Sequence, residues 1–475
     1  MNQEKLREFE PVFFPKSIAV VGASPNPLKF GNRYLEALIS TGFKGKLYPV
    51  HPSDGQISGL KAYPTVRDIP DPVDYVIVSI PAQHVLGVLD DCAANGVKVV
   101  QFFTAGFSET GEEEGRLLER EMVKKANEGG FRIIGPNCIG VYSPANLMSY
   151  GPMPMLGKVG TVGFISQSGG HAGRIIDIGL RRGIYFSKAV SFGNGPDLDS
   201  VDYLEYFAAD PDTEIIGAYL EGMRQGRRFF KLAKEISKTK PMIIWKGGKT
   251  EAGAEAAASH TGSLAISDTI WSAVLKQAGV VRVDSLEELA DTILTFQHFP
   301  PFLGQNVAII AGLAGGGGGE SVSSTDACAS VGLNVPPFTN ETRSKLKAIL
   351  PPAGSILRNP LDMGGVGGDL DILDRTMEIV VADPRIDLII VNENMDELVM
   401  WVTKERLEIM NDIFVRFRGI KPLVVVSPPG LPSGDCAALE KRLSDAQVTV
   451  YPSLDRAAKA IANMNWYYRF HRGNL

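Results

Sequence analysis

Short apolar runs alternate with longer segments of helical periodicity along the whole chain, and this alternation is the strongest constraint on the fold. Runs rich in β-branched residues, such as Ser17–Ala23, Tyr75–Ile80 and Thr161–Ser166, recur from one end to the other. Between them lie segments such as Gly111–Glu128, which is acidic at its start and basic towards its end, as a helix dipole favours. The pattern is typical of βαβ units around parallel sheets, so we predict an α/β fold.

Length and linker composition predict three domains. The chain has 475 residues, enough for about three domains of roughly 150 residues each. Two stretches rich in proline and glycine, Tyr150–Lys158 and His298–Gly304, have the composition of linkers. We therefore place the domains at residues 1–150, 151–300 and 301–475.

Two segments share a pattern of strand, glycine-rich turn and helix start: Gly160–Arg174 in the second domain and Asn306–Glu320 in the third. We therefore expect these domains to be two copies of one doubly wound fold. Such folds bind ligands beyond the carboxyl ends of their strands, so the loops there are the places to search for a site.

Composition and charge exclude several classes of protein. The formal net charge of −6 argues against a nucleic-acid binder, which usually carries a basic excess. No apolar run reaches the ~18 residues of a membrane span, and the first residues lack the pattern of a signal peptide. The four cysteines are widely spaced, so neither a metal site nor a disulfide framework is expected, and the cytoplasm is the expected compartment.

A glycine-containing turn follows the first predicted strand. It consists of Gly22, Ala23 and Ser24, and its backbone N–H groups and the following helix start are suited to binding phosphate. Its spacing departs from the dinucleotide motif G-x-G-x-x-G, and the second predicted strand ends before His51 without the acid that a NAD site places on the ribose. Coenzyme A, with its phosphorylated ribose, fits better, and Lys29 is a candidate counter-charge. The alternative is a turn that serves only helix–sheet packing.

A second turn follows the strand that opens the second domain. It consists of Ser166, Gln167, Ser168, Gly169 and Gly170, and its N–H groups and hydroxyls at a helix start predict an anion site. The turn matches neither a Walker A loop nor the G-x-S-x-G nucleophile elbow. A tight strand-to-helix turn without a ligand is the alternative.

His260 is a candidate phosphoryl acceptor. It lies in Thr250–Ala265, a stretch of small residues that favours a mobile loop, and a neutral imidazole nitrogen is a good nucleophile. Glu221 ends a predicted strand of the same domain, where its carboxylate could bind the other ring nitrogen of His260 and fix the tautomer. The alternatives are a solvated histidine and an ordinary surface glutamate. The other histidines show no metal-ligand spacing.

Taken together, these motifs resemble the alpha subunit of ADP-forming acetyl-CoA synthetase, within the succinyl-CoA synthetase superfamily. The resemblance runs in order over roughly Phe13–Phe296, and the last third matches through shorter motifs. The matching segments are Phe13–Ser24, Tyr48–Pro52, Thr104–Glu109, Gly135–Gly140, Ser166–Gly169, Ser191–Asn194, Tyr219–Gly222, Ser259–Ala265, Gly315–Gly319 and Asn359–Asp362.

The resemblance implies a Rossmann-like CoA-binding domain followed by two flavodoxin-like domains. It also implies that His260 is phosphorylated, that the serine–glycine turn holds phosphate and that Glu221 steadies the histidine. The implied CoA contacts are Gly22, Ala23, Ser24, Lys29, Val50, His51, Ile80, Pro81, Ala105, Gly106 and Asn137. The implied reversible reaction converts acyl-CoA, phosphate and ADP into a carboxylic acid, CoA and ATP through an acyl phosphate and phosphohistidine.

The resemblance further implies an ATP-grasp beta subunit that binds ADP or ATP with Mg²⁺, in a hetero-oligomer for which α2β2 is one arrangement. The chain departs from the family pattern at His51, where asparagine is usual, at Gly195 and Pro196, which replace a basic residue and alanine, and at Ile266, which replaces glycine. Two other functions stay open: a catalytically idle CoA-binding or regulatory protein, and a nicotinamide-dependent dehydrogenase.

Overall fold

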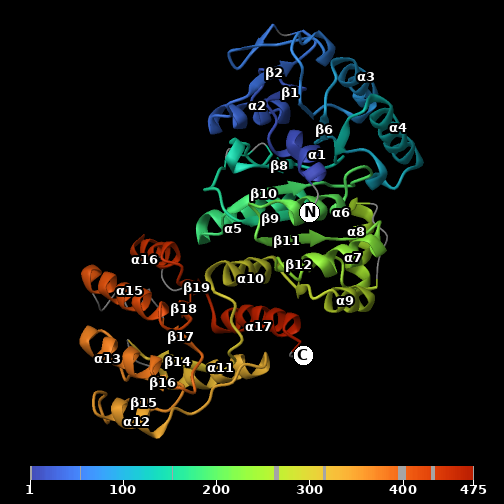
Figure 1. Cartoon of the computed structure of the whole chain (residues 1–475). Helices are drawn as coiled ribbons and strands as arrows, with labels where there is room; N and C mark the ends of the chain where they lie inside the picture. Colours follow the sequence, from blue (N-terminus) through green and yellow to red (C-terminus); the bar gives the residue numbers. More distant parts are fainter. Residues whose placement is uncertain are drawn as a thin grey trace. The chain divides into compact units, whose positions relative to one another are not determined.

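The protein is described from a computed structural model (Figure 1), which describes residues 3–53, 55–151, 153, 155–261, 267–313, 317–393, 403–428 and 434–473. The chain forms two compact units. The first consists of residues 1–180 and 184–289, and the second of residues 181–183 and 290–475. None of the described helices combines the length and the apolar character needed to cross a membrane.

The first sheet of the first unit is parallel, in the order β2-β1-β5-β6-β7. Helix α2 covers one face, and α3 and α4 cover the other (Figure 1). The elements are β1 (Ser17–Val21), α2 (Phe30–Thr41), β2 (Lys46–Val50), β5 (Tyr75–Val78), α3 (Val85–Asn95), β6 (Val99–Phe102), α4 (Glu113–Gly129) and β7 (Arg132–Ile134). Strand β2 lies on one side of β1, and the later strands β5, β6 and β7 lie on the other side, so the strand order reverses between β1 and β5. A sheet of this kind binds its ligand in the crevice at the carboxyl ends of those two strands.

The second sheet of this unit has the order β13-β12-β11-β9-β10-β8, and only β8 runs antiparallel to its neighbour. Its elements are β8 (Gly140–Tyr142), β9 (Val162–Ser166), α5 (Gly169–Arg182), β10 (Phe186–Ser191), α6 (Ser200–Ala209), β11 (Ile215–Leu220), α7 (Gly226–Ile236), β12 (Met242–Lys246), α8 (Glu251–Thr261), α9 (Asp268–Gln277) and β13 (Val281–Val283). Here the strand order reverses between β9 and β11, so the serine–glycine turn that follows β9 lies at the switch point.

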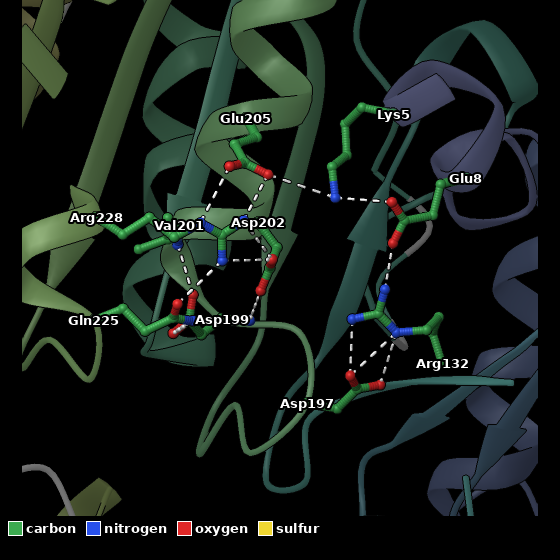
Figure 2. A network of polar contacts seen from close by, with 10 residues as sticks. All are labelled: Lys5, Glu8, Arg132, Asp197, Asp199, Val201, Asp202, Glu205, Gln225 and Arg228. Atoms are coloured by element: carbon green, nitrogen blue, oxygen red, sulfur yellow. Dashed lines mark hydrogen bonds and ion pairs between the residues drawn. The ribbon is translucent and has the colours of Figure 1, made fainter. Parts of the chain in front are cut away.

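Helix α1 (Gln3–Phe13) packs on the second sheet's helix α6 although it begins the chain. The Phe13 and Tyr206 rings stack with centroids 4.7 Å apart, and both side chains are buried. Figure 2 shows the polar side of this contact: Glu8 pairs with Arg132 of β7, and the Arg132 guanidinium binds Asp197 at 2.8 Å. This packing and these ion pairs join the two sheets into one unit.

In the described residues of the second unit, the strands form a sheet in the order β15-β16-β14-β17-β18-β19, which is parallel except for β15. Its elements are α10 (Leu286–His298, which begins in the first unit), β14 (Val307–Ala311), α11 (Gly317–Ser330), α12 (Asn340–Lys347), β15 (Ile356–Leu357), β16 (Leu361–Asp362), α13 (Leu370–Val381), β17 (Leu388–Asn392), α15 (Lys404–Arg418), β18 (Leu423–Val426), α16 (Gly434–Asp445), β19 (Thr449–Tyr451) and α17 (Leu454–His471). The predicted α/β fold is thus confirmed, whereas the domain boundaries at residues 150 and 300 stay predictions.

One local prediction is wrong. The stretch Thr250–Ala265 was expected to form a loop, but Glu251–Thr261 forms helix α8. Small residues suggested a loop, yet most of the small residues here are alanines, and alanine has the highest helix propensity of all residues. Glu251 also lies in the first turn, where a negative charge favours the helix dipole.

Candidate functional site

A cavity of about 870 Å³ lies at the carboxyl ends of the first sheet's strands, at the switch point between β1 and β5. Seven of the residues predicted to contact CoA line it: Gly22, Ser24, Lys29, Val50, His51, Ile80 and Pro81. Ala23 is fully buried beneath the turn, so its side chain serves the core. The cavity is large enough for a nucleotide-sized group.

Gly22 is required by the close approach of β1 to the loop after β5. Its φ is +88°, and a Cβ atom would lie 2.5 Å from the carbonyl oxygen of Ser79. The Ser79 N–H donates to the carbonyl of Val21 at 3.0 Å, which holds the two strand ends together. The glycine therefore allows the backbone itself to form the floor of the cavity.

Charged residues that no motif identified also line this cavity. Arg67, in the 3₁₀ helix η1 (Val66–Asp68), pairs with Asp91 at 3.2 Å, and His84 and Asp90 lie nearby in the lining. Partial burial raises the pKa of Asp91, and the Arg67 guanidinium opposes that shift. Arg67 and Lys29 are the lining cations available to phosphate groups in this part of the described chain.

A second cavity, of about 570 Å³, adjoins the first because Ser79, Ile80 and Pro81 line both. Loops of the first sheet contribute the predicted residues Ala105 and Asn137 to its wall. The start of α5 contributes three residues of the serine–glycine turn, namely Ser168, Gly169 and Gly170. The structure thus brings the two predicted ligand loops to one cavity.

The serine–glycine turn divides into lining and supporting residues. Ser166 is fully buried, and its hydroxyl donates to the Ser168 carbonyl at 2.7 Å. The Ser168 hydroxyl accepts the N–H of His171 at 3.3 Å and so caps α5. The first N–H groups of a helix have no partner within it, so those of Gly169 and Gly170 are oriented to bind an anion.

Gly169 is also required by close packing. A Cβ atom at this position would lie 2.9 Å from the Cγ2 atom of Ile139, which belongs to the loop between β7 and β8. Glycine therefore lets the α5 N-terminus approach the loops of the first sheet.

Gln167 positions the loop after β11 rather than lining the cavity. Its side-chain oxygen accepts the N–H groups of Glu221 and Gly222, the latter at 3.0 Å. Glu221 is buried, and its carboxylate hydrogen-bonds Tyr219. Burial, followed by this carboxylate, raises the pKa of the Tyr219 hydroxyl. Glu221 is therefore a fixed acceptor at the carboxyl end of β11.

Helix α8 carries position 260 in its last turn. The helix lies against the 3₁₀ helix η3 (Ser108–Thr110) of the first sheet's loops. The His260 side chain lies outside the described part of the chain, so its predicted contact with Glu221 stays a prediction. The His171 ring, by contrast, packs against the Tyr219 and Trp245 rings, with centroids 4.5 and 4.6 Å away.

A hydrogen-bond cluster beneath η3 joins both sheets, and the sequence did not predict it. Asn194, which follows β10, donates from Nδ2 to Glu109 at 2.6 Å and to Glu119 at 2.9 Å. The Glu109 carboxylate in turn accepts the backbone N–H of Gly106 at 2.6 Å. Gly106 was predicted to contact CoA, but it lines neither cavity, and its N–H instead helps to hold the loop. Only the three-dimensional arrangement brings these residues together.

Comparisons with known proteins agree with this arrangement. A family model described as a CoA binding domain matches residues 16–144, and one described as a succinyl-CoA ligase like flavodoxin domain matches residues 159–296. The alpha subunit of ADP-forming acetate–CoA ligase I from Pyrococcus furiosus is 38% identical, over 95% of this chain and 96% of that protein. ADP-forming acetate–CoA ligase I from Archaeoglobus fulgidus is 37% identical, over 80% of this chain and 54% of that protein.

A solved structure is similar over almost its whole length. It is the dinucleotide-forming acetyl-coenzyme A synthetase 1 of Ca. Korarchaeum cryptofilum in complex with phosphate and ADP, which is 34% identical, with a TM-score of 0.85 and coverage of 98% of both chains. The Rossmann-like and flavodoxin-like domains implied by the motifs are thereby confirmed. Sequence, fold and relatives agree, and the chain belongs to the ADP-forming acyl-CoA ligase family, among the relatives of its alpha subunits.

Proposed function

We propose that this chain is the alpha subunit of an ADP-forming acyl-CoA ligase, in which the first cavity binds the nucleotide end of CoA and the second holds the thioester beside phosphate. One observation carries the proposal: the two cavities share Ser79–Pro81, and the second also contains the N-terminus of α5. A CoA molecule seated in the first cavity can therefore extend its thiol arm towards an anion held by Gly169 and Gly170.

The first chemical step is attack of phosphate on the thioester. A phosphate oxygen bonds to the carbonyl carbon, and the carbon–sulfur bond breaks. The CoA sulfur takes the proton that hydrogen phosphate loses, which gives acyl phosphate and CoA. The N–H groups of Gly169 and Gly170 hold the phosphate without reorganisation, which favours the attack.

The second step uses His260. Its neutral imidazole nitrogen attacks the phosphorus of the acyl phosphate, the bond from phosphorus to the acyl oxygen breaks, and the carboxylic acid leaves as its anion. An oxygen of ADP then takes the phosphoryl group, which gives ATP and restores the histidine. Glu221 accepts a hydrogen bond from the other ring nitrogen and so stabilises the cationic ring. The burial of Glu221 and its fixed loop support this role.

The site for ADP or ATP lies on a partner subunit in this proposal. ADP or ATP with Mg²⁺ binds an ATP-grasp beta subunit, in a hetero-oligomer such as α2β2. Two comparisons support a separate partner. The Pyrococcus furiosus relative is named an alpha subunit. The present chain aligns with only 54% of the longer Archaeoglobus fulgidus protein, so the rest of that protein has no counterpart in this chain. Within this chain, residues 1–150 bind CoA, residues 151–300 carry the phosphate turn and His260, and residues 301–475 form the second flavodoxin-like domain.

Isotope labelling tests the proposal. The native complex is purified through this chain and incubated with acetyl-CoA and ³²P-phosphate, and the labelled chain is digested and mapped by mass spectrometry. We expect acid-labile label on His260, none in H260N, and normal labelling in the control H471N, which alters a histidine outside both cavities. Label on H260N, or turnover by H260N, would contradict the assigned acceptor.

The same preparation separates the alternatives. An idle CoA-binding protein would bind CoA in a calorimetric titration, yet take up no label and show no turnover. A dehydrogenase would bind NAD in place of CoA.

A further inference from the structure

A cavity of about 530 Å³ in the second unit is lined by helix α12 and by the segment of strand β15, which lie side by side (Figure 1). We call this cavity the edge groove. We propose, independently of the function proposed above, that the edge groove binds an extended acidic segment of a partner protein, which adds as a further strand beside β15. The backbone, the helix wall and the charge of the groove each support this assignment.

The edge groove follows the backbone of the β15 segment. Four successive residues, Ser355–Arg358, line it. Successive side chains of an extended chain point to opposite faces of a sheet, so four residues in a row line one cavity when that cavity runs along the edge of the strand. Among the described strands of this sheet, β15 is at the end of the order and pairs with β16 on one side. Its other side therefore offers backbone N–H and C=O groups to an added strand.

One side of α12 forms the second wall. The residues that line the groove recur at the intervals of a helix face, so they lie on one side of the helix. They are Asn340, Arg343, Ser344 and Lys347. The residues that α12 buries, Thr342 and Leu346, lie between them in sequence and point elsewhere. The core thus holds the helix by another face, and a polar and basic face remains for a ligand.

The charge of the edge groove selects an acidic ligand. Arg343, Lys347 and Arg358 line it and are exposed, and none of its described lining residues is acidic. Within the described part of the chain, no carboxylate forms an ion pair with these three cations. Lys345 of the same helix, by contrast, lies outside the groove and pairs with Glu341 at 2.7 Å. The three cations in the groove can therefore pair with carboxylates of a ligand.

Two features favour a peptide over a small anion. Ile356 of β15 is 39% exposed, so an apolar side chain of an added strand can cover it. The Arg343 guanidinium donates to the side-chain oxygen of Asn340, which orients this cation along the helix. A phosphate ion would use the cations, but it would leave the strand edge and Ile356 uncovered.

Two designed peptides test the charge preference. One alternates aspartate and valine over about eight residues, and the other alternates lysine and valine over the same length. In fluorescence anisotropy with the full chain at low ionic strength, the acidic peptide should bind at least about 10-fold more tightly, because three exposed ion pairs together give a factor of this order. Equal affinities, or tighter binding of the basic peptide, would overturn the proposal.

Substitutions test the location. R343Q/K347Q should bind the acidic peptide about 5-fold more weakly or worse, and R358Q should weaken it in the same direction by less. K345Q is the matched control, because Lys345 lies on the same helix but outside the groove, and it should bind as the parent does. The altered side chains are exposed, so these changes leave the core intact. Unchanged binding by R343Q/K347Q, or an equal loss in K345Q, would exclude the edge groove.

Hydrogen exchange tests the added strand. With saturating acidic peptide, the fragment that contains Ser355–Arg358 should exchange its amide protons at least about 5-fold more slowly, because new backbone hydrogen bonds protect them. A ligand held by charge alone would leave this exchange unchanged. Unchanged exchange would overturn strand addition, and binding of inorganic tripolyphosphate in preference to the acidic peptide would overturn the assignment to a protein partner.

Discussion

Asn194 donates from its side-chain amide to the carboxylate of Glu109 at 2.6 Å, across the junction between the two sheets of the first unit. The same nitrogen donates to Glu119 at 2.9 Å, so one amide group donates hydrogen bonds to two carboxylates that lie close together. Glu109 holds the N–H groups of Gly106 and Phe107, and η3, which follows directly, supports α8. Asn194 is therefore a positioning residue for the loop that carries Ala105 and for the helix that carries His260.

Substitution N194A should weaken this junction. Two carboxylates lose their shared donor, so we expect the free energy of unfolding to fall by about 1–3 kcal/mol. The rate of His260 phosphorylation should fall by a larger factor than CoA affinity. The floor of the CoA cavity at Gly22 is held by the hydrogen bond from Ser79 to Val21, which does not involve Asn194. Urea unfolding, CoA titration and single-turnover labelling measure the three quantities.

N194D sharpens this test. It keeps the size of the side chain but places a third carboxylate beside Glu109 and Glu119, so it should be more harmful than N194A. A variant N194D as stable and as active as the parent would contradict the positioning role.

Substitution G22A should damage the CoA site directly. The added Cβ atom would meet the Ser79 carbonyl at 2.5 Å in a backbone conformation with φ +88°. We expect at least about 1–3 kcal/mol of destabilisation and a large loss of CoA affinity, since both strand ends must shift. Thermal unfolding and CoA titration measure these effects.

Gly87 offers a matched control for stability. It lies within α3, and a Cβ atom there would meet nothing within 4 Å. G87A should therefore stabilise the chain by up to about 1 kcal/mol, because alanine has the higher helix propensity. Equal destabilisation by G22A and G87A would show that the close approach at Gly22 has no special importance.

Substitution E221Q should separate chemistry from binding. The amide cannot accept as strongly as a carboxylate from an imidazole N–H, so phosphorylation of His260 should slow by about 10–100-fold. CoA affinity should stay unchanged, because Glu221 lines neither cavity. E235Q, which alters an exposed glutamate of α7 paired with Lys238, is the control and should leave both quantities unchanged. Full-rate labelling of E221Q would remove Glu221 from the mechanism.

The parts of the site that could be predicted are local in the sequence. Gly22 directly follows β1, and the turn at Ser168–Gly170 follows β9 and begins α5, so a few adjacent residues specify both their conformation and their place at a sheet edge. Because parallel strands present their carboxyl ends at one edge, these turns were expected to lie near a ligand, and both line cavities.

The parts that were missed depend on long-range packing. Asn194 lies 85 residues from Glu109 in the chain, and neither residue has a local pattern that indicates the contact. Phe103, which lines the second cavity, and Arg67 likewise gain their positions from helices and strands remote in sequence. The error at α8 has another cause: small residues suggest a loop, but most of those in Glu251–Thr261 are alanines, and alanine favours a helix.

His298 should make the stability of the second unit depend on pH. Its side chain is buried and its Nδ1 lies 3.1 Å from the Thr449 hydroxyl, and burial, followed by the Arg418 and Arg182 charges, lowers its pKa to about 4. The unfolded chain, with an ordinary histidine pKa of about 6.5, binds the proton more tightly, so the free energy of unfolding should fall as the pH drops from 6.5 to 4. The loss of unfolding free energy should reach about 3 kcal/mol near pH 4 and be absent above pH 7.

The variant H298Q tests this assignment, because it keeps a hydrogen-bonding side chain but does not titrate. Its free energy of unfolding, measured in urea from pH 4.5 to 7.5, should depend less on pH than that of the parent. The same pH dependence in both proteins would contradict the assignment.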